Sequence, residues 1–518
     1  MALTDLVKGK AEVAFDALQD IAARDPGETA DLALISAHLG RHEYDAALAA
    51  TALLERKLPT KPTAAYLRGL ALRGKGDAAG ARVAFEAALK IEPGHFASVA
   101  SLVSLDLQED KPDAAQQRLQ AAIKLNPKNI SARMAMVDLM VRQKAEPKVL
   151  LSAIDEAIKI APADAAPHVA KIAQLSRMND VKAAVSAAQN AMASLPQDPD
   201  VLQAAGRAMS NAGDEQQALS AFTRLAAAAP RSALPHLLLA DVHAKLGDVA
   251  AAAFSLNRAF DTEPQSAEVH RRLLARASRT KNFKPVLAAA KELQKRFPQS
   301  AAGFLLEGDA EAARKDGPAA LAAYRGSLKK ADTLGIPQKQ VFLTLRLSSD
   351  TAGAERFAVD WLKANPKDAG FRALLGGEAI LRKDYSSAER YFRQVLVLQP
   401  DNGAAMNNLA WLMAERGANG AVALAENALK LAPGAAQVMD TLAKALAAEG
   451  YFARAIDIQK KALSVMPDYH EYRLNLARLY LKAGKRTEAG AELATLARLG
   501  GKFAFQVEVA EMRRALGD

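Results

Sequence analysis

The sequence predicts an all-α fold, a solenoid of repeated helix pairs, from three observations. Prolines recur 33 to 35 residues apart along most of the chain, with one doubled interval between Pro298 and Pro366. An alanine stands twelve residues before most of these prolines, and a larger apolar residue often follows that alanine by four. Half of the residues are apolar but only 5% are aromatic, a composition that suits close helix packing. A fixed period of this length indicates one small unit stacked many times.

The stretch from Ala81 to Pro93 is the template of this unit. A small residue, Ala81, is followed one helical turn later by a large one, Phe85. This order lets two helices approach closely and then fills the space beside the contact, and the closing proline falls where a helix must stop. We therefore expect two antiparallel helices in each unit. Glycines mark the expected turns between them: Gly40, Gly76, Gly213, Gly247, Gly317, Gly450 and Gly484.

The order of these residues resembles the tetratricopeptide repeat. Ala81, Phe85, Ala88 and Pro93 match its second helix, and Gly69 matches its first. The tryptophan of the consensus first helix is absent, and the Gly69 position often holds alanine, which keeps that residue small. The resemblance covers nearly the whole chain. It implies a right-handed α-α superhelix of about 14 helix pairs, with a leading single helix and a C-terminal capping helix.

The leading helix matches the second helix of a unit with no first helix ahead of it. We expect that the chain begins inside a longer array, and a native single-helix cap is the alternative. In the doubled proline interval, Asp332 stands at the position where the repeat would have its proline, and this irregularity predicts a bend nearby. The expected segments are a leading helix over 1–26, repeats over 27–332, an irregular repeat over 333–366, C-terminal repeats over 367–501 and a capping helix over 502–518.

The sequence argues against catalysis. It contains no cysteine, which excludes disulfides, thiol catalysis and thiolate metal sites. Among its eight histidines only His38 and His42 have helical ligand spacing, and the expected turn at Gly40 separates them. There is no glycine-rich phosphate loop and no Gly-x-Ser-x-Gly motif. We expect no enzyme activity, no cofactor and no bound metal.

The net charge of +10 raises the question of an anionic partner. The densest basic run extends from Arg271 to Lys284, but it lacks interleaved aromatic residues that would stack on bases. A solvated helix face is one interpretation and a patch for an anionic ligand is the other, while nucleic acid is disfavoured. The candidate residues for the patch are Arg271, Arg272 and Arg279.

In tetratricopeptide arrays the first helices line a concave groove that holds partner segments, so the resemblance predicts a protein-binding site there. Trp411 is either an exposed binding residue or a filler between two units. Recognition of an acidic chaperone tail is not expected, because Thr441 and Glu471 replace residues of the known clamp. The predicted groove residues are Asn407, Asn408, Trp411, Asp440, Lys444, Asn475, Arg478 and Lys482.

A narrower resemblance concerns the segment from Asn407 to Glu415, Asn-Asn-Leu-Ala-Trp-Leu-Met-Ala-Glu, in a long alanine-rich array with a terminal cap. It is similar to the repeat lipoproteins of bacterial exopolysaccharide systems, and in particular to those that accompany PEP-CTERM protein sorting. This resemblance implies an exported, lipid-anchored scaffold in the periplasm. The sequence has no cysteine for such an anchor, so the anchor would lie in a preceding segment.

Three functions are consistent with these observations. The first is an envelope scaffold that holds partner proteins in its groove. The second is a cytosolic adaptor or regulator with the same kind of groove. The third is the regulatory array of a truncated glycosyltransferase or similar enzyme, although the expected terminal cap argues against it.

Overall fold

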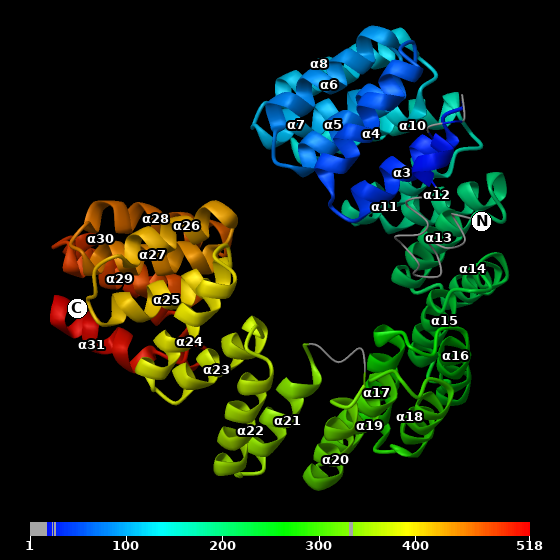
Figure 1. Ribbon diagram of the computed structural model, residues 1–518. Helices are drawn as coiled ribbons and strands as arrows, with labels where there is room; N and C mark the ends of the chain where they lie inside the picture. Colours follow the sequence, from blue (N-terminus) through cyan, green and yellow to red (C-terminus); the bar gives the residue numbers. More distant parts are fainter. Residues whose placement is uncertain (1–17, 23, 25–26, 331–334, 518) are drawn as a thin grey trace. The chain divides into compact units, whose positions relative to one another are not determined.

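A computed structural model describes residues 18–22, 24, 27–330 and 335–517 (Figure 1). These residues form α-helices joined by short turns, with one 3-10 helix, η1 (Gly500–Lys502), and no β-strand among them. The all-α prediction is confirmed. Asp332 and most of the expected leading helix lie outside the described residues.

The chain divides into two compact units, Met1–Val269 and His270–Asp518. The helices of the first unit pair in chain order, each packed against the next. They are α3 (Thr29–Gly40), α4 (Tyr44–Lys57), α5 (Pro62–Gly74), α6 (Ala78–Ile91), α7 (Phe96–Gln108), α8 (Pro112–Leu125), α9 (Ile130–Arg142), α10 (Pro147–Ile160), α11 (Ala165–Arg177), α12 (Val181–Ser194), α13 (Pro199–Asn211), α14 (Glu215–Ala228), α15 (Leu234–Lys245) and α16 (Val249–Thr262).

The second unit begins within α17 and continues the same arrangement. With it, the 28 helices from α3 to α30 form 14 pairs in the described part of the chain. Its helices are α17 (Ala267–Thr280), α18 (Lys284–Arg296), α19 (Ala302–Ala313), α20 (Gly317–Ser327), α21 (Pro337–Leu347), α22 (Thr351–Ala364), α23 (Ala369–Leu381), α24 (Tyr385–Leu398), α25 (Gly403–Glu415), α26 (Ala421–Leu431), α27 (Ala436–Ala448), α28 (Phe452–Val465), α29 (His470–Lys482), α30 (Arg486–Ala497) and α31 (Gln506–Leu516).

In four of the helix pairs, a glycine of the first helix faces an aromatic ring of the second. A Cβ added at Gly69 would lie 2.3 Å from Cε1 of Phe85, and the same clash would arise at Gly206 against Phe222. The second unit repeats this contact with Gly308 against Tyr324 and Gly376 against Phe392. These rings are nearly fully buried, as is Ala81 one turn before Phe85. The small residue that each ring packs against is the glycine of the first helix.

The turns inside the helix pairs each place a residue in the left-handed region near the end of the first helix, at spacings of 33 to 35 residues. Six of these residues are glycines and eight are not. The expected turn glycines Gly40 and Gly317 are wrong in detail: Gly40 ends α3 and Gly317 begins α20, while His42 and Lys315 adopt the positive φ. The eight left-handed residues that are not glycine are His42, Asp110, Lys144, Asn179, Lys281, Lys315, Ser349 and Lys383.

An aspartate often follows the left-handed residue and caps the second helix. Asp77 accepts a hydrogen bond from the backbone N–H of Gly80, and Asp384 accepts one from that of Ser387. Such a side chain satisfies a backbone donor that the first helical turn leaves unpaired. The turn and the cap together explain why the second helix starts at the same position in successive repeats. The other aspartates of this kind are Asp180, Asp214, Asp248, Asp316 and Asp350.

The C-terminal helix α31 packs on the last repeat. Val509 of α31 is buried with Leu493 and Leu496 of α30. The helix begins at Gln506, within the predicted segment 502–518, because η1 and a short turn precede it. None of the described helices has the length and apolarity needed to cross a bilayer.

Candidate partner-binding groove

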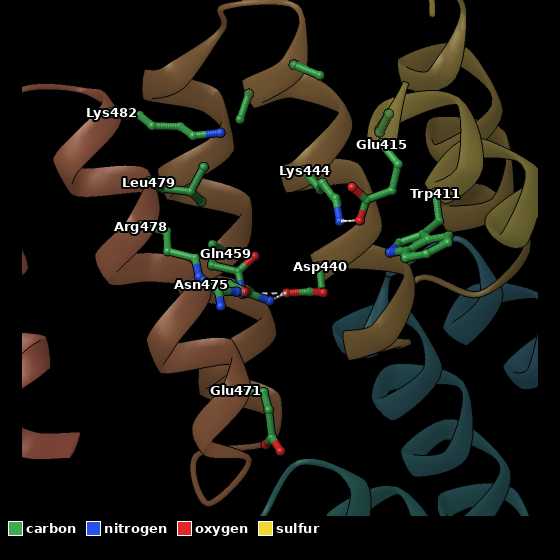
Figure 2. A pocket seen from close by; sticks show the side chains of 13 residues that line it. Trp411, Glu415, Asp440, Lys444, Gln459, Glu471, Asn475, Arg478, Leu479 and Lys482 are labelled. Carbon is green, nitrogen blue, oxygen red and sulfur yellow. Dashed lines mark hydrogen bonds and ion pairs between the residues drawn. The ribbon is translucent and has the colours of Figure 1, made fainter. Parts of the chain in front are cut away.

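Three successive first helices of the second unit, α25, α27 and α29, line two neighbouring cavities that share Trp411 and Asp440. We call the first, of about 540 Å³, the lysine cavity, and the second, of about 670 Å³, the tyrosine cavity. The lysine cavity is lined by Trp411, Ala414, Glu415, Asp440, Lys444, Ala447, Ala448, Gln459, Glu471, Asn475, Arg478, Leu479 and Lys482 (Figure 2). The tyrosine cavity is lined by Ile380, Asn407, Asn408, Trp411, Ala435, Ala436, Gln437, Asp440, Thr441, Met466, Tyr469 and Tyr472.

All eight predicted groove residues line one of these two cavities. Asn407 and Asn408 line the tyrosine cavity, Trp411 and Asp440 line both, and the other four line the lysine cavity. The sequence analysis predicted that these residues lie close together, because the first helices of successive repeats lie side by side. Their role in binding stays a prediction.

Trp411 is both a packing residue and a cavity wall. It is half-buried, and its ring makes an edge contact with Tyr385 at 5.9 Å between centroids. The ammonium of Lys444 lies 5.0 Å from the centroid of the indole, within reach of a cation–π interaction. Lys444 also forms an ion pair with Glu415. Trp411 therefore packs against a neighbouring helix and also lines both cavities, so its surroundings agree in part with each of the two interpretations, filler and binding residue.

Asp440 is the centre of a hydrogen-bond network between α27, α28 and α29. Its Oδ1 accepts hydrogen bonds from Nε2 of Gln459, at 2.7 Å, and from Nδ2 of Asn475, at 2.8 Å (Figure 2). Gln459 is buried and also donates to the backbone carbonyl of Tyr472. These bonds hold the carboxylate at the junction of the two cavities.

Arg478 is committed to the C-terminal helix. Its guanidinium donates two hydrogen bonds to the carboxylate of Glu508 on α31, at 2.8 and 2.7 Å, and a third to Asn475 at 2.7 Å. This forked geometry is the strongest form of an arginine–carboxylate pair. Arg478 therefore fastens α31 to the groove, which sequence reasoning missed because Glu508 lies outside the repeats.

The lysine cavity balances its own charge. Three acidic residues and three basic ones line it, and the Lys444–Glu415 and Arg478–Glu508 pairs engage two of the basic side chains. Lys482 is exposed and has no ion-pair partner among the described residues. Figure 2 shows Lys482 and Glu471 toward opposite ends of α29, on the side that faces α27.

Asn407 is a buried amide without a partner. Its side chain is only 6% exposed, and its Oδ1 has no hydrogen-bond donor among the described residues. A buried polar group left in this state costs free energy, so each one calls for an explanation. Asn407 lies in the wall of the tyrosine cavity.

The tyrosine cavity has a negative character. Asp440 is the one charged residue among those that line it. Burial raises the pKa of Tyr472, and the nearby negative charges of Asp440, Tyr469 when ionised, and Glu471 raise it further. Tyr469 and Tyr472 lie with their ring centroids 4.5 Å apart. Sequence reasoning missed both tyrosines, since Tyr469 precedes α29 and Tyr472 reads as a core residue.

The predicted anionic patch lies on α17. Arg279 is exposed, whereas Arg271 and Arg272 each interact with other residues. His38 and His42 bond instead to Glu43 and Tyr44 respectively. Within the described residues no group of three histidine or acidic side chains could hold a metal ion.

Comparison with known sequences assigns the repeat. Residues 72–139, 211–277 and 446–504 match one profile of the tetratricopeptide repeat, and residues 32–96 match a second. These stretches of the chain carry tetratricopeptide repeats. The tetratricopeptide fold is a protein-interaction scaffold, generally without catalytic activity, and this sets the class of function. A search of curated proteins finds no match.

Three solved structures are similar to the chain. Naa15/Naa10 bound to HypK-THB is 17% identical over 90% of this chain and 68% of its own, with a TM-score of 0.34. The Cut9–Hcn1 hetero-tetramer of the APC/C is 14% identical over 89% and 99%, with a TM-score of 0.36. The type IV pilus biogenesis factor PilW is 18% identical over 41% and 98%, with a TM-score of 0.33. The repeat assignment rests on the sequence profiles.

Proposed function

We propose that this tetratricopeptide protein is a non-catalytic scaffold that binds segments of partner proteins in the groove of α25, α27 and α29. The observation that carries the proposal is the pair of joined cavities along three successive first helices. They hold a half-buried tryptophan, an unpartnered amide and an exposed lysine in one continuous wall. Aromatic side chains beside polar and charged groups are typical of sites that bind protein segments.

The proposed setting is the bacterial cell envelope, in exopolysaccharide export or PEP-CTERM sorting. The segment from Asn407 to Glu415 that carries this resemblance supplies Asn407, Asn408 and Trp411 to the cavities. We propose that the full-length protein is anchored as a lipoprotein and acts in the periplasm. A cytosolic adaptor would use the same groove on other partners.

The structure guides the choice of test positions. Replacing Trp411 would disturb its contact with Tyr385, and replacing Arg478 would remove its ion pair with Glu508 of α31. Lys482 is exposed, lines the lysine cavity and has no ion-pair partner among the described residues, so a change there tests the groove without damage to the fold. Lys461 on α28 is equally exposed and lines neither cavity, which makes it the matched control.

A photo-crosslinking amino acid would be placed at position 482 or at position 461 of the full chain. Each protein would then be exposed to envelope and cytosolic fractions of the source cell. We expect adducts at 482, absent at 461, with envelope proteins of polysaccharide export or sorting. Adducts at 482 with cytosolic proteins alone would favour the adaptor, and equal adducts at both positions would reject the groove.

A further inference from the structure

The tyrosine cavity differs from its neighbour in charge and in hydrogen bonding. The lysine cavity holds as many basic as acidic residues, while Asp440 is the one charged residue that lines the tyrosine cavity. Oδ1 of Asp440 has two donors, whereas Oδ2 has none among the described residues. This cavity therefore offers a carboxylate oxygen that has no hydrogen-bond donor among the described residues.

Three aromatic residues line the same cavity as this carboxylate. Trp411, Tyr469 and Tyr472 all line the tyrosine cavity with Asp440. Aromatic rings attract cations through their faces, and the attraction grows when the cation is removed from water. Tyr469 is 43% exposed, although a ring of this size is usually more covered, so part of its surface remains open to a ligand.

Asn407 adds an amide without a hydrogen-bond partner to the residues that line the tyrosine cavity. Its amide lines the same cavity at 6% exposure and makes no hydrogen bond within the described residues. A bound segment that reached this amide would remove the cost of leaving it unpaired. The amide, the carboxylate and the rings together fit a flexible side chain that ends in a cationic hydrogen-bond donor.

We propose that the tyrosine cavity is a subsite for a basic side chain, lysine or arginine, of an extended partner segment. The proposal rests on the scaffold function above and names the chemistry of the partner. Asp440 supplies the countercharge, Trp411 and the two tyrosines supply the aromatic walls, and Asn407 binds a polar group of the same segment. The partner is thus basic at this subsite, the opposite of an acidic tail.

The test uses Trp411 as its own reporter. In a chain with Trp361→Phe, tryptophan emission comes from Trp411, and the replacement keeps a ring at position 361 beside Phe357. Three blocked pentapeptides are titrated, each with a central arginine, citrulline or glutamate between glycines. Citrulline has the shape of arginine without its charge. We expect saturable binding of the arginine peptide, at least about tenfold tighter than the other two, as for one charge-assisted hydrogen bond.

Two variants locate the subsite. Asp440→Asn should bring binding of the arginine peptide down to the level of the citrulline peptide, while Asp457→Asn, an exposed carboxylate on α28, should leave it unchanged. Tyr469→Leu should weaken binding and Tyr469→Phe should retain it, because the ring face is what attracts the cation. Helicity and melting temperature confirm that each variant folds.

Equal binding of the arginine and citrulline peptides, tighter binding of the glutamate peptide, no binding of any peptide, or no effect of Asp440→Asn would each overturn the proposal. These outcomes are separable from failure of the scaffold function. Partner adducts at position 482 without arginine binding would leave the scaffold and remove the basic subsite. Arginine binding without such adducts would leave the subsite and reject the proposed envelope partners.

Discussion

Inside the helix pairs the same contact recurs, whereas successive repeats present different side chains to the groove. A glycine meets an aromatic ring at Gly69, Gly206, Gly308 and Gly376. In the groove, the position that holds Asn407 holds threonine in the next repeat and asparagine again in the one after it. The same contact thus stabilises several helix pairs, while the side chains in the groove differ from one repeat to the next. This contrast predicts large stability effects inside the pairs and small ones in the groove.

The largest effect is expected from filling a small-residue position inside a pair. Ala218 and Ala388 are fully buried, so Ala218→Leu or Ala388→Leu should destabilise the protein by about 3 kcal/mol through overpacking. Denaturant unfolding measures the loss. Ala227→Leu, on the exposed side of α14, is the control and should be nearly neutral. Unchanged melting of both buried variants would contradict the close-contact interpretation.

A smaller effect is expected at the one repeat where the buried ring is a tyrosine. The hydroxyl of Tyr324 donates to Oδ1 of Asp309 at 2.7 Å. Burial raises the pKa of Asp309, while the Tyr324 hydrogen bond and the charge of His270 act to lower it. Tyr324→Phe should cost about 1.5 kcal/mol at neutral pH, as for a hydrogen bond to a charged group.

The pH dependence of this variant follows from the sign of the shift. A carboxyl whose pKa is raised on folding favours the native state when protonated, and this stability is lost as the pH rises above the unfolded pKa. Removing the Tyr324 hydroxyl raises the pKa of Asp309 further. The loss from Tyr324→Phe should therefore be larger at neutral pH than at acid pH. A loss that is equal at both would show that Asp309 is not the partner that matters.

Two adjacent glycines on α23 sharpen the contrast within one helix. A Cβ at Gly376 would lie 2.8 Å from Cζ of Phe392, whereas a Cβ at Gly377 would meet nothing within 4 Å. Gly376→Ala should destabilise by about 1 kcal/mol, because the ring must move. Gly377→Ala should instead stabilise by about 0.5 kcal/mol through helix propensity. The same sign for both variants, by thermal unfolding, would refute the repeated contact.

The smallest stability effect is expected in the groove. Lys482→Glu changes an exposed side chain with no ion pair among the described residues, so unfolding should shift by less than about 0.5 kcal/mol. Partner capture should nevertheless fall, because the charge that faces the lysine cavity is reversed. Lys461→Glu is the matched control for both measurements. A large stability loss from Lys482→Glu alone would mean that the groove face is part of the packed interior.

Much of the fold could be predicted because its signals lie within one repeat. The Ala81–Phe85 order and the closing proline predicted two helices in each unit, although the contact of Phe85 with Gly69 came only from the structure. The turn chemistry was only partly predictable. Each turn needs one left-handed residue, but residues such as His42 and Lys315 adopt that conformation as well, so glycine alone is an incomplete marker.

The groove was predictable in position but not in its pairing. Because the period aligns first helices, all eight predicted residues meet at two joined cavities. The sequence could not show that Arg478 is held by Glu508, or that Tyr469 and Tyr472 join the wall. Glu508 lies outside the repeats, and the two tyrosines do not occupy the repeat positions from which the groove residues were predicted.

By itself, the sequence determined the all-α class, the period, the two-helix unit and the residues that line its first helices. The order of residues within one repeat determines these features, since each helix and turn is specified within about 34 residues. Only the tertiary structure decided which charged side chains pair with each other and which have no partner. That outcome depends on distances between side chains from different helices. In the tyrosine cavity it leaves Oδ2 of Asp440 and Oδ1 of Asn407 without a hydrogen-bond donor among the described residues.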